Sequence, residues 1–423
     1  MANNFDSNFT RKLARVFLEK FDSERVLSKN VNTQLLSGKF DPSTGTVVDF
    51  KRPTDYKSVR TSAGDLSSNT ASDIITGKAS GTVQDYFSVH VDFNEADEAL
   101  KMDQLDQLLA PMATRIKTDL ELDFAAFMMK NSNLVYGSVG AGVSTWDEIA
   151  GAGALLQATG VPMDMPWCYA VNPFTQRSLA SNQRSLASGS DRLVDEAHER
   201  AIISRNFAGF KVMTATTLAS YTTGSGADRS GVVLASPDVT YVTAKDTMTQ
   251  TISVYGLPDG SVIPAGQPVR ITGRNRLNLS TRQQIIDETG AAIVFSGVVK
   301  SAVTVSGSTA SLTISGPAIY EATGAYNTTA SAVVAGDVIT LLGAQNTTYM
   351  PNMFWHPQAF GIGSVPLKKL YSTDTIATTE DGLQFRVSKG TSFLQNKQLV
   401  RFDFRPAYAC LNPFFAGQGY GDN

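Results

Sequence analysis

DQLDQLLAPMATRIKTDLELDFAAFMMKN, residues 103–131, is the segment that predicts the central helix of the fold. Apolar side chains recur in it at intervals of three and four residues: Leu105, Leu108, Leu109, Met112, Ile116, Leu120, Phe124, Phe127 and Met128. This spacing predicts one apolar stripe along an α-helix. From Ala110 to Asn131 the helix would be about 33 Å long, at roughly 1.5 Å per residue.

Two further expectations concern this helix. Pro111 comes early in the segment, where it can serve as the first residue of the main helix instead of breaking it. The face opposite the stripe is expected to be solvated, because it carries charges of both signs: Arg115, Lys117, Asp119, Glu121 and Asp123. A helix of this kind is typical of an ordinary α+β core, so the flanking segments must indicate the function.

Length and composition exclude several classes of protein. With 423 residues the chain is expected to hold two or three domains. Its formal net charge of −3 gives no global footprint for nucleic acid, so any contact with DNA would be local. The polar start predicts no signal peptide, and no apolar run approaches the roughly 20 residues that span a bilayer. Cys168 and Cys410 lie in strand-like apolar runs, where buried free thiols are expected.

The segment before the helix has the pattern of a β-arm. Apolar residues alternate around Val48 and again from Val83 to Phe93, and a polar insert separates the two runs. An isolated two-stranded arm cannot cover its own faces, so it needs a surface outside its own domain. This indicates an assembly protein, and the candidate inter-subunit contacts are the charged residues of the arm: Lys51, Arg52, Asp55, Lys57, Arg60, Asp65, Asp73 and Lys78.

Mixed α/β sequence follows the helix, and a composition change interrupts it. Thr145 is predicted to cap a helix that ends at Gly160, and a second helix should begin at Pro173. From about Ser220 to Tyr349 the chain becomes rich in Thr, Ser, Val and Gly, with short alternating runs between turn signals. This pattern predicts an antiparallel barrel or sandwich, inserted into a loop of the surrounding domain and able to fold as residues 222–349 alone.

The sequence contains no convincing catalytic constellation. The acidic box at residues 195–198 lacks the phosphate-binding loop that its chemistry requires, and no zinc-protease, hydrolase or dinucleotide motif occurs. His90, His198 and His356 lie in three different segments. We therefore expect no enzyme activity, no cofactor and no metal.

The order of these segments resembles the major coat proteins of short-tailed bacteriophages related to P22 and Sf6, which have the HK97-like capsid fold. The stretches that carry the resemblance run from one end of the chain to the other: Leu35-Leu-Ser-Gly, Ser43-Thr-Gly, Phe50-Lys-Arg-Pro53, Ile75-Thr-Gly-Lys-Ala, Leu109-Ala-Pro111, Thr118-Asp-Leu-Glu, Phe127-Met-Met, Asn206-Phe-Ala-Gly-Phe, Met350-Pro-Asn-Met-Phe and Pro406-Ala-Tyr-Ala-Cys-Leu-Asn-Pro413.

The resemblance implies an α+β HK97-like fold with an inserted antiparallel β-barrel, the I-domain. Its parts would be an N-terminal arm (1–39), an E-loop hairpin with flanking strands (40–93), a peripheral domain with the spine helix (94–132), an axial α/β domain with returning peripheral strands (133–219 and 351–423) and the I-domain (220–350). The E-loop would lie along the neighbouring subunit.

The implied function is that of a major capsid protein. Hexamers and pentamers of the chain would form an icosahedral T=7 procapsid with a scaffolding protein and a portal protein, assembled in the cytoplasm of the host bacterium. The shell would expand as double-stranded DNA is packaged, and the mature protein would be part of the virion, with non-specific DNA contact inside and no membrane. The β-rich middle leaves an alternative: a tail adhesin or another carbohydrate-binding protein.

Overall fold

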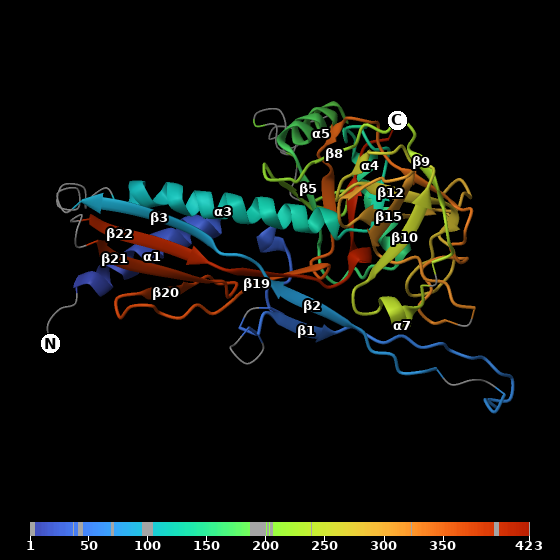
Figure 1. The fold of residues 1–423 in the computed structure, drawn as a ribbon, viewed down its shortest axis with the longest axis horizontal. Coiled ribbons are helices and arrows are strands. Elements are labelled where there is room, and N and C mark those ends of the chain that lie inside the picture. The colour runs from blue at the N-terminus through green and yellow to red at the C-terminus, as the bar shows by residue number, and fades with distance from the viewer. Residues whose placement is uncertain are drawn as a thin grey trace. The chain divides into compact units, whose positions relative to one another are not determined.

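The computed structural model describes residues 5–36, 38–40, 45–68, 72–94, 105–186, 200, 203, 206–237, 239–322, 324–392 and 397–422 (Figure 1). The acidic box at 195–198 lies outside these residues. Contacts divide the chain into two compact units: the first is Met1–Asp49, Ser80–Ala125 and Phe360–Cys410, and the second is Phe50–Ala79, Ala126–Ala359 and Leu411–Asn423.

The first unit contains helices packed beside two antiparallel sheets. Its helices are α1 (Phe5–Glu24), the short η1 (Ser28–Asn30) and most of α3 (Leu105–Lys130). One sheet has the order β1-β2-β23-β19, formed by Val47–Lys51, Lys78–Val83, Pro406–Cys410 and Phe360–Ser364. The other has the order β20-β21-β22-β3, formed by Thr375–Thr378, Gln384–Ser392, Lys397–Phe404 and Phe87–Asn94.

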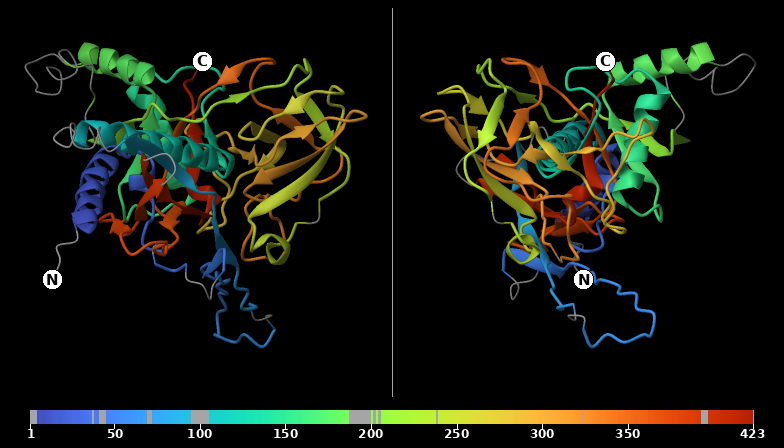
Figure 2. Two further views of the ribbon diagram at one scale, coloured as in Figure 1. Left: turned by 60° about the vertical axis from the view of Figure 1, so that its left-hand side comes forward. Right: turned by 90° about the vertical axis from the view of Figure 1, so that its right-hand side faces the viewer.

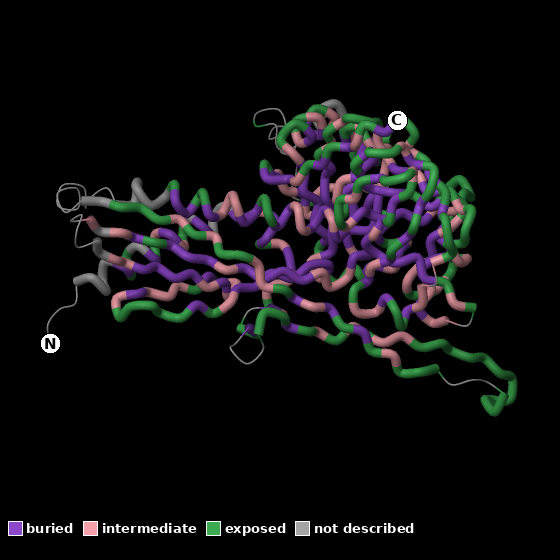
Figure 3. Tube along the Cα trace, in the orientation of Figure 1, coloured by how far each residue is buried: buried purple, intermediate pink, exposed green. Residues whose placement is uncertain are grey.

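Helix α3 confirms the apolar stripe from Met112 to Met128, whereas the side chains of Leu105, Leu108 and Leu109 lie outside the described ones. Ile116 is 1% exposed, and Leu120, Phe124 and Met128 are fully buried, while exposed residues alternate with these along the helix (Figure 3). Pro111 lies inside the helix, so the expectation that it begins the helix is wrong. A proline removes one backbone hydrogen bond from a helix interior, and a helix of this length with a buried stripe retains the others.

Glu121 corrects the expectation of a fully solvated charged face. Its side chain is 1% exposed, and its carboxylate accepts hydrogen bonds from the backbone N–H groups of Leu27 at 2.7 Å and Ser28 at 3.0 Å. It also accepts from the Ser28 hydroxyl. These N–H groups open the short helix η1, where a carboxylate satisfies donors that have no partner within the helix. Glu121 thus fastens the segment after α1 to α3.

An aromatic cluster holds α1 on the sheet of its own unit. The Phe17 ring stacks on Phe402 with centroids 4.6 Å apart, and the Phe21 ring meets Phe385 edge-on at 4.5 Å. Phe385 in turn stacks on Phe404 at 4.5 Å. Such pairs stabilise a core beyond the area they bury. The N-terminal helix is therefore integrated into this unit.

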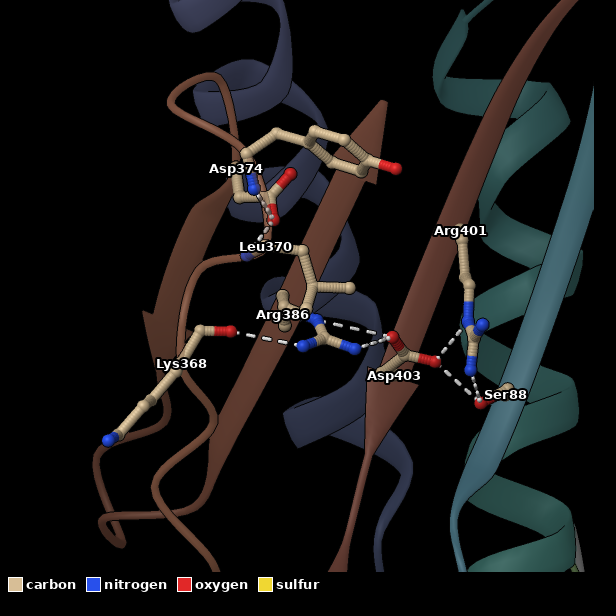
Figure 4. A network of polar contacts seen from close by, with 8 residues as sticks. Ser88, Lys368, Leu370, Asp374, Arg386, Arg401 and Asp403 are labelled. Atoms are coloured by element: carbon tan, nitrogen blue, oxygen red, sulfur yellow. Dashed lines mark hydrogen bonds and ion pairs between the residues drawn. The ribbon is translucent and has the colours of Figure 1, made fainter. Parts of the chain in front are cut away.

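A buried carboxylate joins three strands of the second sheet. Asp403 on β22 is fully buried and accepts hydrogen bonds from Arg386 at 2.5 Å, Arg401 at 2.6 Å and the Ser88 hydroxyl at 2.5 Å (Figure 4). Arg386 also donates to the Lys368 carbonyl at 3.0 Å. Burial alone would raise the pKa of Asp403, but the hydrogen bonds from Ser88 and the two arginines outweigh it and lower that pKa.

This network predicts an acid-sensitive sheet. Because the pKa of Asp403 is lower in the folded than in the unfolded chain, its stabilising contribution is present above about pH 4 and is lost as pH falls through the folded pKa. Asp403→Asn should increase the rate of amide hydrogen exchange in β21 and β22 at pH 7. Between pH 3 and 5, the exchange rate of these strands should depend less on pH in the variant than in the wild type. Mass spectrometry of the exchanged peptides measures both effects. An unchanged pH dependence would contradict the assignment.

The second unit contains a mixed six-stranded sheet covered by helices. Its order is β4-β24-β18-β5-β7-β6, formed by Leu134–Tyr136, Ala416–Gly419, Asn352–Trp355, Trp167–Val171, Phe210–Thr214 and Asn206–Phe207. Helix α4 (Trp146–Thr159) has the predicted capping box of Thr145 and Glu148, and Gly160 ends it with a φ of 92°. Helix α5 (Pro173–Leu186) begins at the predicted proline.

The Thr/Ser-rich segment forms a closed barrel, which decides between the barrel and the sandwich. Its order is β10-β15-β13-β12-β16-β9, formed by Thr249–Tyr255, Thr309–Ser315, Val294–Val299, Pro268–Asn275, Val338–Leu341 and Ser230–Val233 (Figure 2). The paired strands β10 and β15 alternate inward residues, such as Ile252 opposite Leu312, with outward ones. Strands β11 (Val262–Ile263) and β14 (Val303–Thr304) form a separate pair.

Two features describe how the barrel joins the rest of its unit. The chain enters and leaves through the paired short strands β8 (Tyr221–Thr222) and β17 (Thr348–Tyr349). Phe414, in the short helix η4 (Pro413–Phe415), belongs to the hydrophobic core of the barrel and is 2% exposed. The independent folding of residues 222–349 remains a prediction, and that fragment would lack this ring.

Candidate functional site

The candidate site is the arm, defined here as residues 52–77 between β1 and β2. Within its described residues, 52–68 and 72–77, the arm contains no strand, so regular pairing is confined to the base at β1 and β2. Figure 2 shows an open loop beyond these strands. The backbone N–H of Arg52 donates to the Gly77 carbonyl at 2.8 Å, which closes the arm where it leaves the strands.

One side of the arm base is held by two residues of the inserted barrel domain. The Arg282 guanidinium pairs with the Asp55 carboxylate at 2.6 Å and donates to the Asn327 carbonyl at 2.9 Å. The Tyr326 hydroxyl accepts from the backbone N–H of Asp55 at 2.9 Å. The same hydroxyl donates to the Ile75 carbonyl at 3.4 Å. A single phenol oxygen therefore bridges the outgoing and the returning segment of the arm.

An apolar cluster supports this bridge. Ile75 packs against buried residues of the barrel domain: Tyr241, Ala244, Ile319 and Tyr326. The rings of Tyr241 and Tyr326 are stacked with centroids 3.6 Å apart and planes 2° from parallel. Burial, and then the neighbouring Tyr326, raise the pKa of Tyr241, which is therefore a neutral phenol at pH 7. The hydroxyl of Tyr326 is thus held in a fixed place.

The returning segment has a second attachment just after the short helix α7 (Tyr241–Ala244). The Lys245 ammonium donates to the Thr76 carbonyl at 3.2 Å, and the Asp246 carboxylate accepts from the backbone N–H of Lys78 at 3.1 Å. Gly77 lies so close to this turn that a Cβ atom would come within 2.6 Å of the Lys245 carbonyl oxygen. A glycine is therefore required where the backbone approaches the domain.

The tip of the arm, residues 57–73, has a different environment. Its described residues are exposed, including the apolar Val59 and Leu66. The backbone N–H of Lys57 donates to the Ser72 hydroxyl at 3.4 Å, and the Asp65 carboxylate accepts from the backbone N–H of Ser67 at 2.9 Å. That hydrogen bond lowers the pKa of Asp65, which is a carboxylate at neutral pH. Both of these hydrogen bonds join residues within the tip.

The eight predicted contact residues thus fall into three groups. Arg52 and Asp55 have partners in their own chain, since Arg52 donates to the carbonyls of Leu411 and Lys78. Lys78 is exposed on β2 with its backbone held by Asp246. The others are exposed and form no ion pair with a described residue: Lys51, Lys57, Arg60, Asp65 and Asp73. Their role between subunits remains a prediction.

Sequence reasoning missed the residues that hold the base. Arg282, Tyr326 and Asp246 lie far along the chain from the arm, in a segment whose pattern indicates only strands and turns. An unpaired aspartate in a polar arm gives no signal for a partner 227 residues away. The one local sign was the glycine at position 77, next to a lysine in a polar stretch.

The cysteines and histidines of the described chain lie outside the arm. No group of three or more His, Cys, Asp or Glu residues in the described part of the chain could hold a metal ion. Burial raises the pKa of Cys168 to about 12, so this thiol is protonated at neutral pH. Cys410 is only partly buried, contrary to expectation. His356 is fully buried and hydrogen-bonded to Asp164 at 2.9 Å. No helix among the described residues is long and apolar enough to cross a membrane.

A family model and a curated relative both indicate the coat proteins of phages. The family model of the P22 coat protein, gene protein 5, matches residues 1–421. A major capsid protein of Acyrthosiphon pisum secondary endosymbiont phage 1 is 34% identical over 425 residues, covering 100% of both chains. Among solved structures, one from Mycobacterium phage Che8 has a TM-score of 0.47 at 12% identity, covering 93% of this chain and 90% of that one. The capsid structure of cyanophage P-SCSP1u has a TM-score of 0.42 at 10% identity, covering 90% and 84%.

The chain belongs to the P22 coat protein family and is a phage major capsid protein, a structural subunit of a shell made from copies of itself. Its fold is the expected HK97-like capsid fold, a mixture of helices and sheets with an inserted closed barrel. The family assignment decides against the alternative of a tail adhesin or carbohydrate-binding protein.

Proposed function

We propose that this capsid protein assembles with a scaffolding protein and a portal protein into a T=7 procapsid of hexamers and pentamers. The procapsid forms in the cytoplasm of the host bacterium, and its shell expands when double-stranded DNA is packaged to give the virion. With a net charge of −3, the subunit meets the DNA through local, non-specific contacts. The resemblance to the P22 and Sf6 coat proteins supports these steps.

Within the shell, the tip of the arm lies on a neighbouring subunit. The contrast between the two parts of the arm carries this proposal: the base has polar and apolar partners in its own chain, whereas the described tip residues have none beyond the tip. An exposed ion pair is worth only about 0.2–1 kcal/mol, but a shell repeats it in every subunit. The domain boundaries given above, including the I-domain at 220–350, belong to the same proposal.

Co-expression with the scaffolding protein of the same phage tests the proposed assembly. Sedimentation should show closed particles. Negative-stain microscopy of the same sample should show shells of one diameter. Expression without the scaffold should give monomers or irregular shells. Monomers alone under both conditions would overturn the dependence on scaffolding protein, and elongated trimers would overturn the shell itself.

A further inference from the structure

We infer that the inserted barrel domain is the element that orients the arm, through a clamp formed by Tyr326 and Arg282. The inference deepens the proposed function, because it rests on an arm that reaches a neighbouring subunit. It assigns a positioning role to the barrel domain in addition to its place in the fold. Figure 1 shows the arm leaving its strands near α7, the helix that carries Tyr241.

The clamp connects the two backbone segments of the arm base to each other. Two segments that leave β1 and return to β2 would separate or twist freely if only their strand ends held them. The Tyr326 hydroxyl bonds to the backbone of both segments, at Asp55 and at Ile75. Because it engages backbone atoms, this bond fixes the direction of the chain and not merely a side chain.

The charges around the clamp are arranged to hold the outgoing segment. The Arg282 side chain is 24% exposed and pairs with the Asp55 side chain, which is 42% exposed. Solvent screens a pair of this exposure, so its main effect is geometric. Arg282 also donates to the carbonyl of Asn327, the residue after Tyr326, and therefore links the ion pair to the tyrosine.

The returning segment also has contacts that do not depend on the Tyr326 hydroxyl. Lys245 and Asp246 bond to the backbone at Thr76 and Lys78. The Ile75 side chain is partly buried and packs against the apolar cluster that contains the stacked rings. Both segments of the base are therefore attached to the barrel domain, and the tip extends beyond these attachments.

The test compares two tyrosines of the same stack. Tyr326→Phe removes the bridging hydroxyl and keeps the ring, whereas Tyr241→Phe removes a hydroxyl that does not bridge the two segments of the arm. Spin labels at Ser62 in the tip and Ser253 on the barrel, in a Cys410→Ser background, report the arm direction by pulsed electron resonance. Both labelled positions are exposed, and the measurement uses the unassembled full chain.

The expected result is a narrow distance distribution in the wild type and in Tyr241→Phe, and a broadened one in Tyr326→Phe. Amide exchange at Asp55 should accelerate about tenfold in Tyr326→Phe, since a hydrogen bond of ordinary strength is lost. Asp55→Asn should broaden the distribution less, because the backbone bond to Tyr326 remains. An equally narrow distribution in Tyr326→Phe would overturn the clamp.

Assembly is measured separately on the same variants. The clamp is tested by the distance distribution of the unassembled chain, in which no neighbouring subunit takes part. A negative result there is therefore distinguishable from a failure of the proposed contact between subunits. A broadened arm with a reduced rate of shell formation supports both proposals. A broadened arm with wild-type assembly retains the clamp and removes the proposed function of the tip.

Discussion

Replacing residues 58–71 with Gly-Gly is expected to abolish closed shells and to leave a folded monomer. Lys57 and Ser72 lie side by side, with the N–H and hydroxyl 3.4 Å apart, so a two-residue turn can join them. The replacement keeps Asp55, Ile75 and the whole clamp. Removing residues 54–78 would instead take Ile75 away from the apolar cluster and expose Tyr326.

Sedimentation with co-expressed scaffold measures the assembly, and circular dichroism melting checks the monomer. The matched control keeps the length of the arm and removes its side chains: residues 58–71 are replaced by the same number of Gly and Ser residues. If side-chain contacts hold the neighbouring subunit, both variants should fail to form shells. Particles of wild-type size from the shortened arm would show that the tip is not an assembly element.

Ile116→Asp is expected to remove the folded first unit. The Ile116 side chain is 1% exposed on the apolar stripe of α3, and an aspartate there would be a buried charge without a partner. Leaving such a charge uncompensated costs about 3–5 kcal/mol, which is comparable to the stability of a whole domain. The variant should accumulate in the insoluble fraction, and any soluble protein should lose amide protection in β21 and β22.

Leu122→Asp is the matched control, since it places the same charge on the same helix. Leu122 is 45% exposed, so the new carboxylate stays in water and the effect on stability should remain within about 0.5 kcal/mol. Equal solubility and equal exchange for the two variants would contradict the burial of the stripe.

The periodic features of this chain were predictable from the sequence, since they depend on local spacing. The stripe of α3 follows from apolar residues every three or four positions, and the capping box of Thr145 and Glu148 follows from side chains three residues apart. The inserted barrel was visible as a change in composition. Its closure was not, because it depends on the pairing of β9 with both β10 and β16.

The features that the sequence hid depend on partners far apart in the chain. Glu121 has the spacing of a solvated residue, yet its carboxylate is buried and accepts hydrogen bonds from the backbone of Leu27 and Ser28. Asp55 similarly looked like a free charge of a polar arm, and Arg282 supplies its partner. Local patterns do not encode such contacts, because the fold alone brings the two groups together.

The most direct test of the central claim, that the arm acts between subunits, is a cross-link from the tip. A photoreactive amino acid at Ser62, an exposed tip position, should yield cross-linked dimers of the chain in assembled shells and none in dilute monomers. The same group at the exposed Ser253 of the barrel serves as the comparison position. We predict that dimers dominate for Ser62, and peptide mapping should place the second site on another copy. Cross-links from Ser62 that fall only within one chain, in closed shells, would contradict the account.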